Sequence, residues 1–148
     1  MTRTTLYRLD EIARIRAVQC SAAEAAAGIA AQDAERRVEE RRPLDEAVGF
    51  AAQGYRESLE QGGFDAALTE NWHRQVADRL QRLSGHDQLI DAARTEAASS
   101  AEHWHRSSGL LALAEAARRQ AQRHSARRRD EAAMADAADL RSARTEQP

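Results

Sequence analysis

The sequence has little of the residues that build loops, sheets and large apolar cores. Only two prolines and seven glycines occur in 148 residues, and aromatic residues make up 4%. No run of β-branched residues alternates with the period of two that marks a half-buried strand, so we expect no strands. Hydrophobic residues reach 42%, but many are alanines, which form helix readily and bury little area. This composition excludes a large globular core and predicts a single all-α domain.

Cysteine, lysine and long apolar runs are also scarce. Cys20 is the only cysteine, which excludes an internal disulfide and suits a reducing compartment. Every basic side chain except histidine is arginine. The longest apolar run, residues 110–114, is far too short to span a bilayer. The net charge of −2 indicates no particular class of partner. We therefore expect a cytoplasmic protein without direct membrane insertion.

The only Gly-Gly pair divides two long helical stretches. Gly62-Gly63 can adopt left-handed backbone angles at no steric cost, and Asp65 beyond it is a good helix N-cap. The sequence therefore predicts one long antiparallel two-helix coiled-coil hairpin over residues 1–148. We expect helix over about 5–61, a turn over 62–65, helix over 66–141 and a frayed tail over 142–148. Pro43 stands inside the first helix, where we favour a kink over a split into two helices.

Apolar residues at helical spacing mark the faces along which the two helices should pack. The first stripe comprises Leu6, Leu9, Ile12, Ile15, Val18, Ala22, Ala25 and Ile29, and after Pro43 it continues with Leu44, Val48, Ala51, Tyr55 and Leu59. In the second helix, one position of a heptad repeat holds Val76, Leu83, Ile90, Ala97, Trp104 and Leu111. The companion position is expected to hold Leu80, Asp87, Arg94, Ala101 and Ser108. Half of the predicted seam is therefore polar or small.

No constellation of residues suited to catalysis is present. The sequence contains no glycine-rich phosphate loop and no nucleophile elbow. The five histidines are scattered, and the close pair His103 and His105 would point to different faces of a helix. We therefore expect no enzymatic activity, no cofactor and no metal site.

Two features suggest contacts with other molecules. Tyr55, Phe64 and Trp72 surround the predicted turn, where they either form a binding surface or pack on each other across the hairpin. From Arg118 to Arg129 the sequence contains no acidic residue. This segment is either a salt-bridging face or an arginine-rich nucleic-acid binder. The absence of interleaved aromatic residues and the acidic residues that follow favour the salt-bridging face.

The same residues carry a resemblance to a known family. A leucine-containing N-terminal helix precedes residues 55–59 (Tyr-Arg-Glu-Ser-Leu), a glycine-containing turn and then Trp72, and the chain ends in residues 129–138, an alanine-rich stretch with acids. Together they resemble the type III secretion central stalk proteins, the family of the flagellar export protein FliJ and the virulence protein YscO. The resemblance extends over nearly the whole chain, although Pro43 and the alanine-rich seam depart from the family's pattern.

The resemblance implies a non-enzymatic stalk in the cytoplasm, at the membrane-associated secretion apparatus. In the family the helix ends enter the pore of a hexameric export ATPase, the turn region reaches the cytoplasmic domain of the export gate, and some members bind secretion chaperones. The matching gate-binding positions here are Leu44, Val48, Ala51, Tyr55, Val76, Leu80 and Leu83. For the ATPase we expect contacts from Arg118, Arg119, Arg123, Arg127, Arg128 and Arg129. A coiled-coil adaptor or chaperone in another assembly is the alternative, and nucleic-acid binding is a more distant one.

Overall fold

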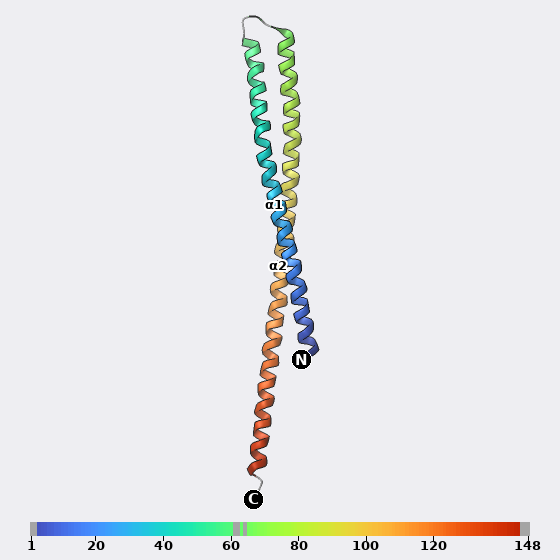
Figure 1. The fold of residues 1–148 in the computed structure, drawn as a ribbon, viewed down its shortest axis with the longest axis vertical. Helices are drawn as coiled ribbons and strands as arrows, with labels where there is room; N and C mark the ends of the chain where they lie inside the picture. The colour runs from blue at the N-terminus through green and yellow to red at the C-terminus, as the bar shows by residue number, and fades with distance from the viewer. Residues whose placement is uncertain (1–2, 61–62, 64, 146–148) are drawn as a thin grey trace. The chain divides into compact units, whose positions relative to one another are not determined.

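Two long helices make up the protein. The computed structural model describes the backbone of residues 3–60, 63 and 65–145, and the side chains of 4–60, 63, 65–139 and 141. Helix α1 is Arg3–Glu60 and helix α2 is Ala66–Thr145 (Figure 1), with no strand in the described ranges. The prediction of an all-α helical hairpin is confirmed. α1 begins at residue 3 rather than 5, and α2 continues past residue 141 into the segment predicted to fray.

The start of α2 is fixed by Asp65, as predicted. The Asp65 carboxylate oxygen Oδ1 accepts hydrogen bonds from the backbone N–H groups of Ala67 and Leu68 at 2.9 and 3.2 Å. Its carbonyl oxygen accepts from the Thr69 N–H at 3.0 Å. These bonds satisfy donors that have no partner in the first turn of a helix. Gly63 lacks the positive φ that we expected, and Gly62 lies outside the described residues. The cap, rather than a left-handed glycine at position 63, therefore defines this end of the turn.

Pro43 does not divide the first helix. α1 is continuous from Arg3 to Glu60 with Pro43 inside it, and the proline ring is exposed. Proline has no N–H, so the carbonyl of Glu39 loses its usual helical donor. The alternative in which α1 splits into two helices at Pro43 is thereby excluded.

The chain comprises two compact units, which are described separately. Unit 1 combines residues 1–23 with residues 103–148, and unit 2 is residues 24–102. In both units the buried and half-buried positions follow the alternating three- and four-residue steps of a heptad repeat, which is the pattern of a coiled-coil seam. On α1 the seam positions of unit 1 are Leu6, Leu9, Ala13, Arg16, Cys20 and Ala23, and those of unit 2 are Ala27, Ala30, Ala34, Arg37, Arg41, Leu44, Val48, Ala51, Tyr55 and Ser58.

The predicted heptad line on α2 is confirmed, but its companion line is wrong. Val76, Leu83, Ile90, Ala97, Trp104 and Leu111 are all buried or half-buried. The companion positions lie three residues after each of these, not four. They are Arg79, His86, Ala93, Ser100, Ser107 and Ala114. Of the predicted companions, Leu80, Arg94 and Ser108 are exposed, whereas Asp87 and Ala101 are half-buried. A step of three residues and a step of four turn to opposite sides of the starting residue, by about 60° and 40°, so the two companion lines lie on different faces of α2.

The predicted stripe at the start of α1 is also partly wrong. Leu6 and Leu9 lie in the seam, but Ile12, Ile15, Val18, Ala22, Ala25 and Ile29 are exposed. Each step of three residues turns about 60° short of a full circle, so four successive steps from Leu6 move Val18 far around the helix. After Pro43 the prediction holds for Leu44, Val48, Ala51 and Tyr55, whereas Leu59 is exposed and Ser58 takes the seam position.

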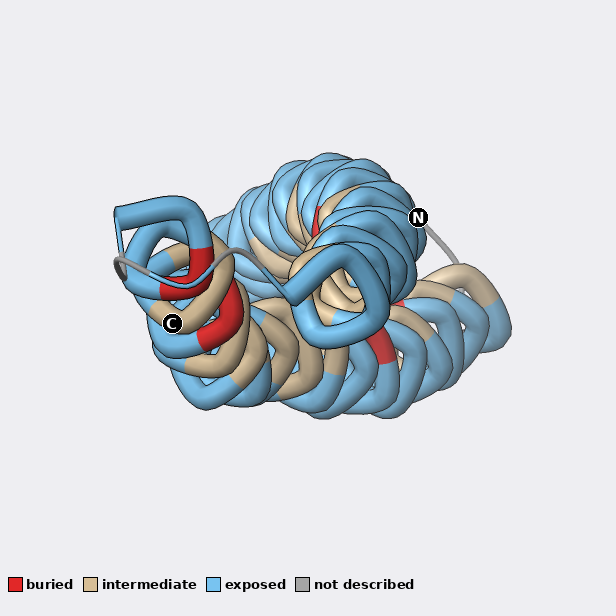
Figure 2. Tube along the Cα trace, turned by 90° about the horizontal axis from the view of Figure 1, so that it is seen from above, coloured by how far each residue is buried: buried red, intermediate tan, exposed pale blue. Residues whose placement is uncertain are grey.

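The core that results is thin and made of small side chains. The buried hydrophobic residues are alanines apart from Ile90, and Figure 2 shows buried positions in red at only a few turns of each helix. Alanine lets two helices approach closely but contributes little apolar area. No helix in the described part of the chain is long and apolar enough to cross a membrane.

Candidate partner-binding surfaces

Six of the seven predicted gate-binding residues lie between the helices of unit 2 rather than on its surface. Ala51 is fully buried, Leu80 is 48% exposed, and the remaining five are half-buried. Those five are Leu44, Val48, Tyr55, Val76 and Leu83. The apolar pattern that suggested a binding face is therefore mainly the seam of the hairpin, and Leu80 alone is directly available to a partner.

Aromatic side chains close the seam near the turn. Trp72 from α2 fits against Gly54 of α1, where a Cβ atom would lie 2.8 Å from the indole carbons Cε2, Cζ2 and Cη2. The ring of Phe50 meets Trp72 edge to face, with centroids 6.0 Å apart and an angle of 68°. Tyr55 lies against His73 at a centroid distance of 5.9 Å. For Tyr55 and Trp72, packing across the hairpin is thus the alternative that the structure supports, and Phe64 lies outside the described residues.

Four large apolar residues near the turn of unit 2 remain exposed, two on α1 before the turn and two on α2 after it. Phe50 is 65% exposed although one edge touches Trp72. Leu59, Leu68 and Leu80 are also exposed. Sequence reasoning missed Phe50 and Leu68 as surface candidates, because both stand outside the apolar stripes. The sequence does contain a signal for Phe50, because this aromatic residue lies between two positions of the predicted apolar stripe and not on it.

Three polar contacts join the helices of unit 2 on both sides of Pro43. The Arg79 guanidinium donates to the carbonyl oxygen of Ala47 at 2.6 Å. Arg41 Nε donates to the Asp87 carboxylate at 2.6 Å. His86 Nε2 lies 2.8 Å from the carbonyl oxygen of Arg37, and since a carbonyl only accepts, this nitrogen carries the proton. The side chains of the seam residues Arg41, Arg79 and His86 are therefore satisfied by the opposite helix, which fixes the register of the pair.

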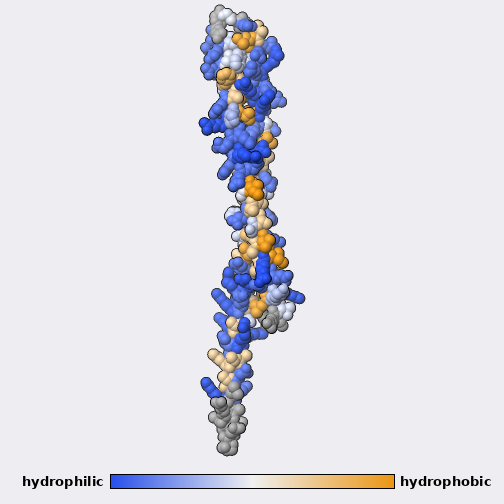
Figure 3. Space-filling model, viewed as in Figure 1, coloured by the Kyte–Doolittle hydropathy of each residue, from blue (hydrophilic) through white to orange (hydrophobic). Residues whose placement is uncertain are grey.

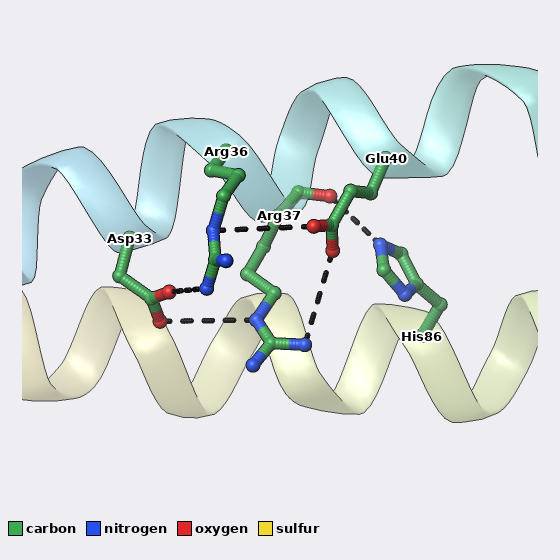
Figure 4. Close-up of polar contacts among 5 residues, drawn as sticks. All are labelled: Asp33, Arg36, Arg37, Glu40 and His86. Atoms are coloured by element: carbon green, nitrogen blue, oxygen red, sulfur yellow. Dashed lines mark hydrogen bonds and ion pairs between the residues drawn. The ribbon is translucent and has the colours of Figure 1, made fainter.

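The charged run before Pro43 forms a network along one helix. Asp33 accepts from Arg36 and lies 3.7 Å from Arg37, and Glu40 lies 3.9 Å from each of these arginines (Figure 4). The hydrogen bond from Arg36 lowers the pKa of the Asp33 carboxyl below its usual 3.8 and raises the pKa of the Arg36 guanidinium. The bond to Asp87 likewise raises the pKa of Arg41. The run, residues 33–42, is largely a solvated face, although Arg37 and Arg41 also occupy seam positions.

The predicted arginine cluster divides into residues held by the hairpin and residues that are free to bind. Arg118 is half-buried in unit 1, and its Nη1 donates to Asp10 at 3.2 Å while its Nε has no partner. Arg119 pairs with Glu115 at 3.4 Å, and Arg129 donates to Ser125. Arg123, Arg127 and Arg128 are exposed, and none of the described side chains forms an ion pair with them.

The C-terminal part of α2 extends beyond the seam of unit 1. Ser125 is the last half-buried position, and residues 126–139 are all exposed while remaining helical (Figure 1). This segment begins with the basic residues Arg127–Arg129 and continues with Asp130, Glu131 and Asp136. Isolated helices of this length are marginal in water. An exposed helix of this kind is therefore a natural site for a partner.

Neither a metal centre nor a known relative points to another activity. The described residues contain no group of three side chains able to hold a metal ion. His105 stacks on Trp104 with ring centroids 5.3 Å apart, a packing contact rather than a ligand arrangement. No protein-family model, curated protein or solved structure matches the chain. Function must therefore be inferred from the exposed surfaces themselves.

Proposed function

We propose that this chain is a non-enzymatic central stalk of a type III secretion system, which inserts into the export ATPase ring and links it to the export gate. The observation that supports this most directly is the exposed helical segment 126–139. Arg123 just before this segment, and Arg127 and Arg128 within it, form no ion pair with any described side chain. A helix that extends beyond its own hairpin and carries charge around its circumference suits a partner that encloses it. The resemblance of the sequence to the stalk family supplies the identity of that partner.

Electrostatics favours carboxylates as the groups that meet this segment. An arginine fork donates two parallel hydrogen bonds to a carboxylate, and partial exclusion of water strengthens the pair. Positions 123, 127 and 128 differ by four and one residues, so their side chains spread over more than one side of α2. A ring of subunits can contact several sides of a helix at once, whereas a flat surface contacts one.

The first experiment tests the ATPase contact by charge reversal. Arg123→Glu, Arg127→Glu and Arg128→Glu together are expected to abolish co-purification with the export ATPase and to lower its stimulated rate of ATP hydrolysis. The control reverses Arg42, Arg74 and Arg82, which are also exposed, lie in unit 2, each pair with an acid four residues away, and produce the same change of net charge. Circular dichroism must show unchanged helicity for both variants. Full stimulation by the 123/127/128 variant would refute the ATPase contact.

Binding to the export gate is expected to use apolar residues that the structure leaves exposed. Phe50→Ala with Leu80→Ala should reduce affinity for the cytoplasmic domain of the gate, because exposed aromatic and aliphatic side chains supply most interface energy. Tyr55→Ala serves as the contrast, since Tyr55 is half-buried beside His73 and should act first on the stability of the hairpin. A loss of affinity for Tyr55→Ala alone would assign the contact to the seam residues instead.

A further inference from the structure

The α1 segment of unit 1 has a second face, largely apolar, that no described part of unit 1 covers. It consists of six exposed positions at steps of three and four residues, here called the outer face: Thr4, Tyr7, Glu11, Ile15, Val18 and Ala22. The seam positions of the same segment run from Leu6 to Ala23 on the other side of α1. Tyr7 is 70% exposed and Val18 is 71% exposed. Figure 3 shows apolar side chains, in orange, reaching the surface among hydrophilic ones.

The spacing of the outer face is that of a helix-packing seam. Steps of 3, 4, 4, 3 and 4 residues keep side chains on one stripe of an α-helix, as they do in a coiled coil. Scattered exposed apolar residues need no explanation, but Tyr7, Ile15, Val18 and Ala22 share one stripe of the helix, which indicates a surface that is covered in use. The occupant that fits such a stripe is another helix.

The outer face is complementary to itself when a second copy lies antiparallel. If residues whose numbers add up to 25 or 26 are placed opposite one another, Thr4 meets Ala22 of the second copy and Tyr7 meets Val18. In the same register Glu11 lies opposite Ile15 of the second copy and next to its Arg14, which is exposed beside the stripe. Each contact occurs twice because a two-fold axis relates the copies. Tyr7 and Val18 thus face each other, and the carboxylate of Glu11, the one charge on the stripe, can reach the Arg14 guanidinium beside Ile15 of the second copy.

We propose that two copies of this chain associate through the outer face of α1 in this antiparallel register. The small number of contacts makes the dimer one that dissociates on dilution. The interface is independent of the proposed secretion function. Two hairpins joined here are wider than one, so self-association and insertion of this end of the chain into a ring exclude each other.

The test is the oligomeric state of the full chain and of charge-swapped variants. Sedimentation equilibrium from about 5 to 500 µM, a range that brackets micromolar affinities, should show a monomer–dimer equilibrium. Glu11→Arg and Arg14→Glu should each weaken dimerisation roughly tenfold, since each places two like-charged pairs in the interface. The double variant should restore it, because the pairs are merely exchanged. A wild-type chain that is monomeric throughout, or a double variant no better than the singles, overturns the proposal.

Further variants test whether the dimer uses this face rather than any exposed apolar residue, and whether it has the proposed register. Val18→Glu should abolish the dimer, whereas Leu113→Glu, at an α2 position that is 69% exposed, should leave it intact. In a Cys20→Ser background, Tyr7→Cys with Val18→Cys should form disulfide-linked dimers on oxidation. Residues 7 and 18 are about 16 Å apart along one helix, so they cannot bond within a chain. Equal loss of the dimer with Leu113→Glu, or cross-linking by Val18→Cys alone, overturns the proposed register.

Discussion

Replacing Gly54 by alanine should destabilise unit 2, although the same change elsewhere on α1 should stabilise it. An alanine inside a helix is favoured over glycine by about 1 kcal/mol. At Gly54 the added Cβ would lie 2.8 Å from three carbons of the Trp72 ring, well inside the usual separation of about 3.5–4.0 Å. The indole is rigid and also touches Phe50, so the helices must separate or the ring must move. Such overpacking costs about 1–3 kcal/mol.

Gly49 is the matched control for Gly54. It lies five residues away on the same helix, and an added Cβ meets nothing within 4 Å. Gly49→Ala should therefore raise the free energy of unfolding by about 1 kcal/mol. Gly54→Ala should lower it by up to about 2 kcal/mol, which is the overpacking cost less the helix gain. The two alanine variants should accordingly differ by about 1–3 kcal/mol.

The assay is urea unfolding followed by far-UV circular dichroism, which reports on helicity whether or not Trp72 is present. Trp72→Leu removes the ring that the new Cβ would meet. In that background Gly54→Ala should become stabilising, by about the same 1 kcal/mol as Gly49→Ala. A double-mutant cycle measures this reversal. If Gly54→Ala stabilises the chain with Trp72 intact, the close fit of indole and glycine is not what joins these helices.

Two other predictions follow from single contacts. Asp65→Ala should cost about 1 kcal/mol through loss of the N-cap bonds to Ala67 and Leu68, whereas Asp65→Asn should retain most of the stability, as measured by thermal unfolding. The pKa of Asp33 is lowered in the folded chain, so its contribution to stability is complete above the usual value of 3.8 and is lost as the pH falls through the lower folded value. Asp33→Asn should therefore flatten the acid limb of a helicity titration, and an unchanged limb would contradict the ion-pair network.

The hairpin itself could be predicted from its turn and helix-capping residues and from its composition. One Gly-Gly pair, an N-cap aspartate and long alanine-rich stretches indicate two helices and a turn, and the bounds of α1 and α2 agree within a few residues. Pro43 could not be resolved in the same way. A proline inside a helix and a proline at the first position of a new helix have similar sequence surroundings. Packing against α2 on both sides of position 43 decides for one helix.

The register of the α2 seam could have been predicted from the sequence, but only by comparing the two companion lines over a longer stretch of residues. Between residues 76 and 111, Leu80 makes the four-residue companion line look as good as the three-residue line. One heptad further in each direction, the three-residue line gains Trp72 and Ala114, whereas the four-residue line gains His73 and Glu115. Arg79 still belongs to the seam, because its guanidinium reaches the Ala47 carbonyl across the helix pair. Long amphipathic side chains can line a seam and place their charge at its edge.

The start of α1 shows why hydrophobicity alone cannot choose a packing face. Its larger apolar residues Ile15 and Val18 lie outside, while the seam takes the smaller Ala13, Cys20 and Ala23. In unit 1 the small seam residues of α1 occur together with the larger Trp104 and Leu111 at half-buried seam positions of α2, a combination that suits packing by complementary size. A search for the most apolar stripe therefore selects the wrong side of this helix. The larger residues it selects remain available, which is why the outer face is better explained by association than by folding.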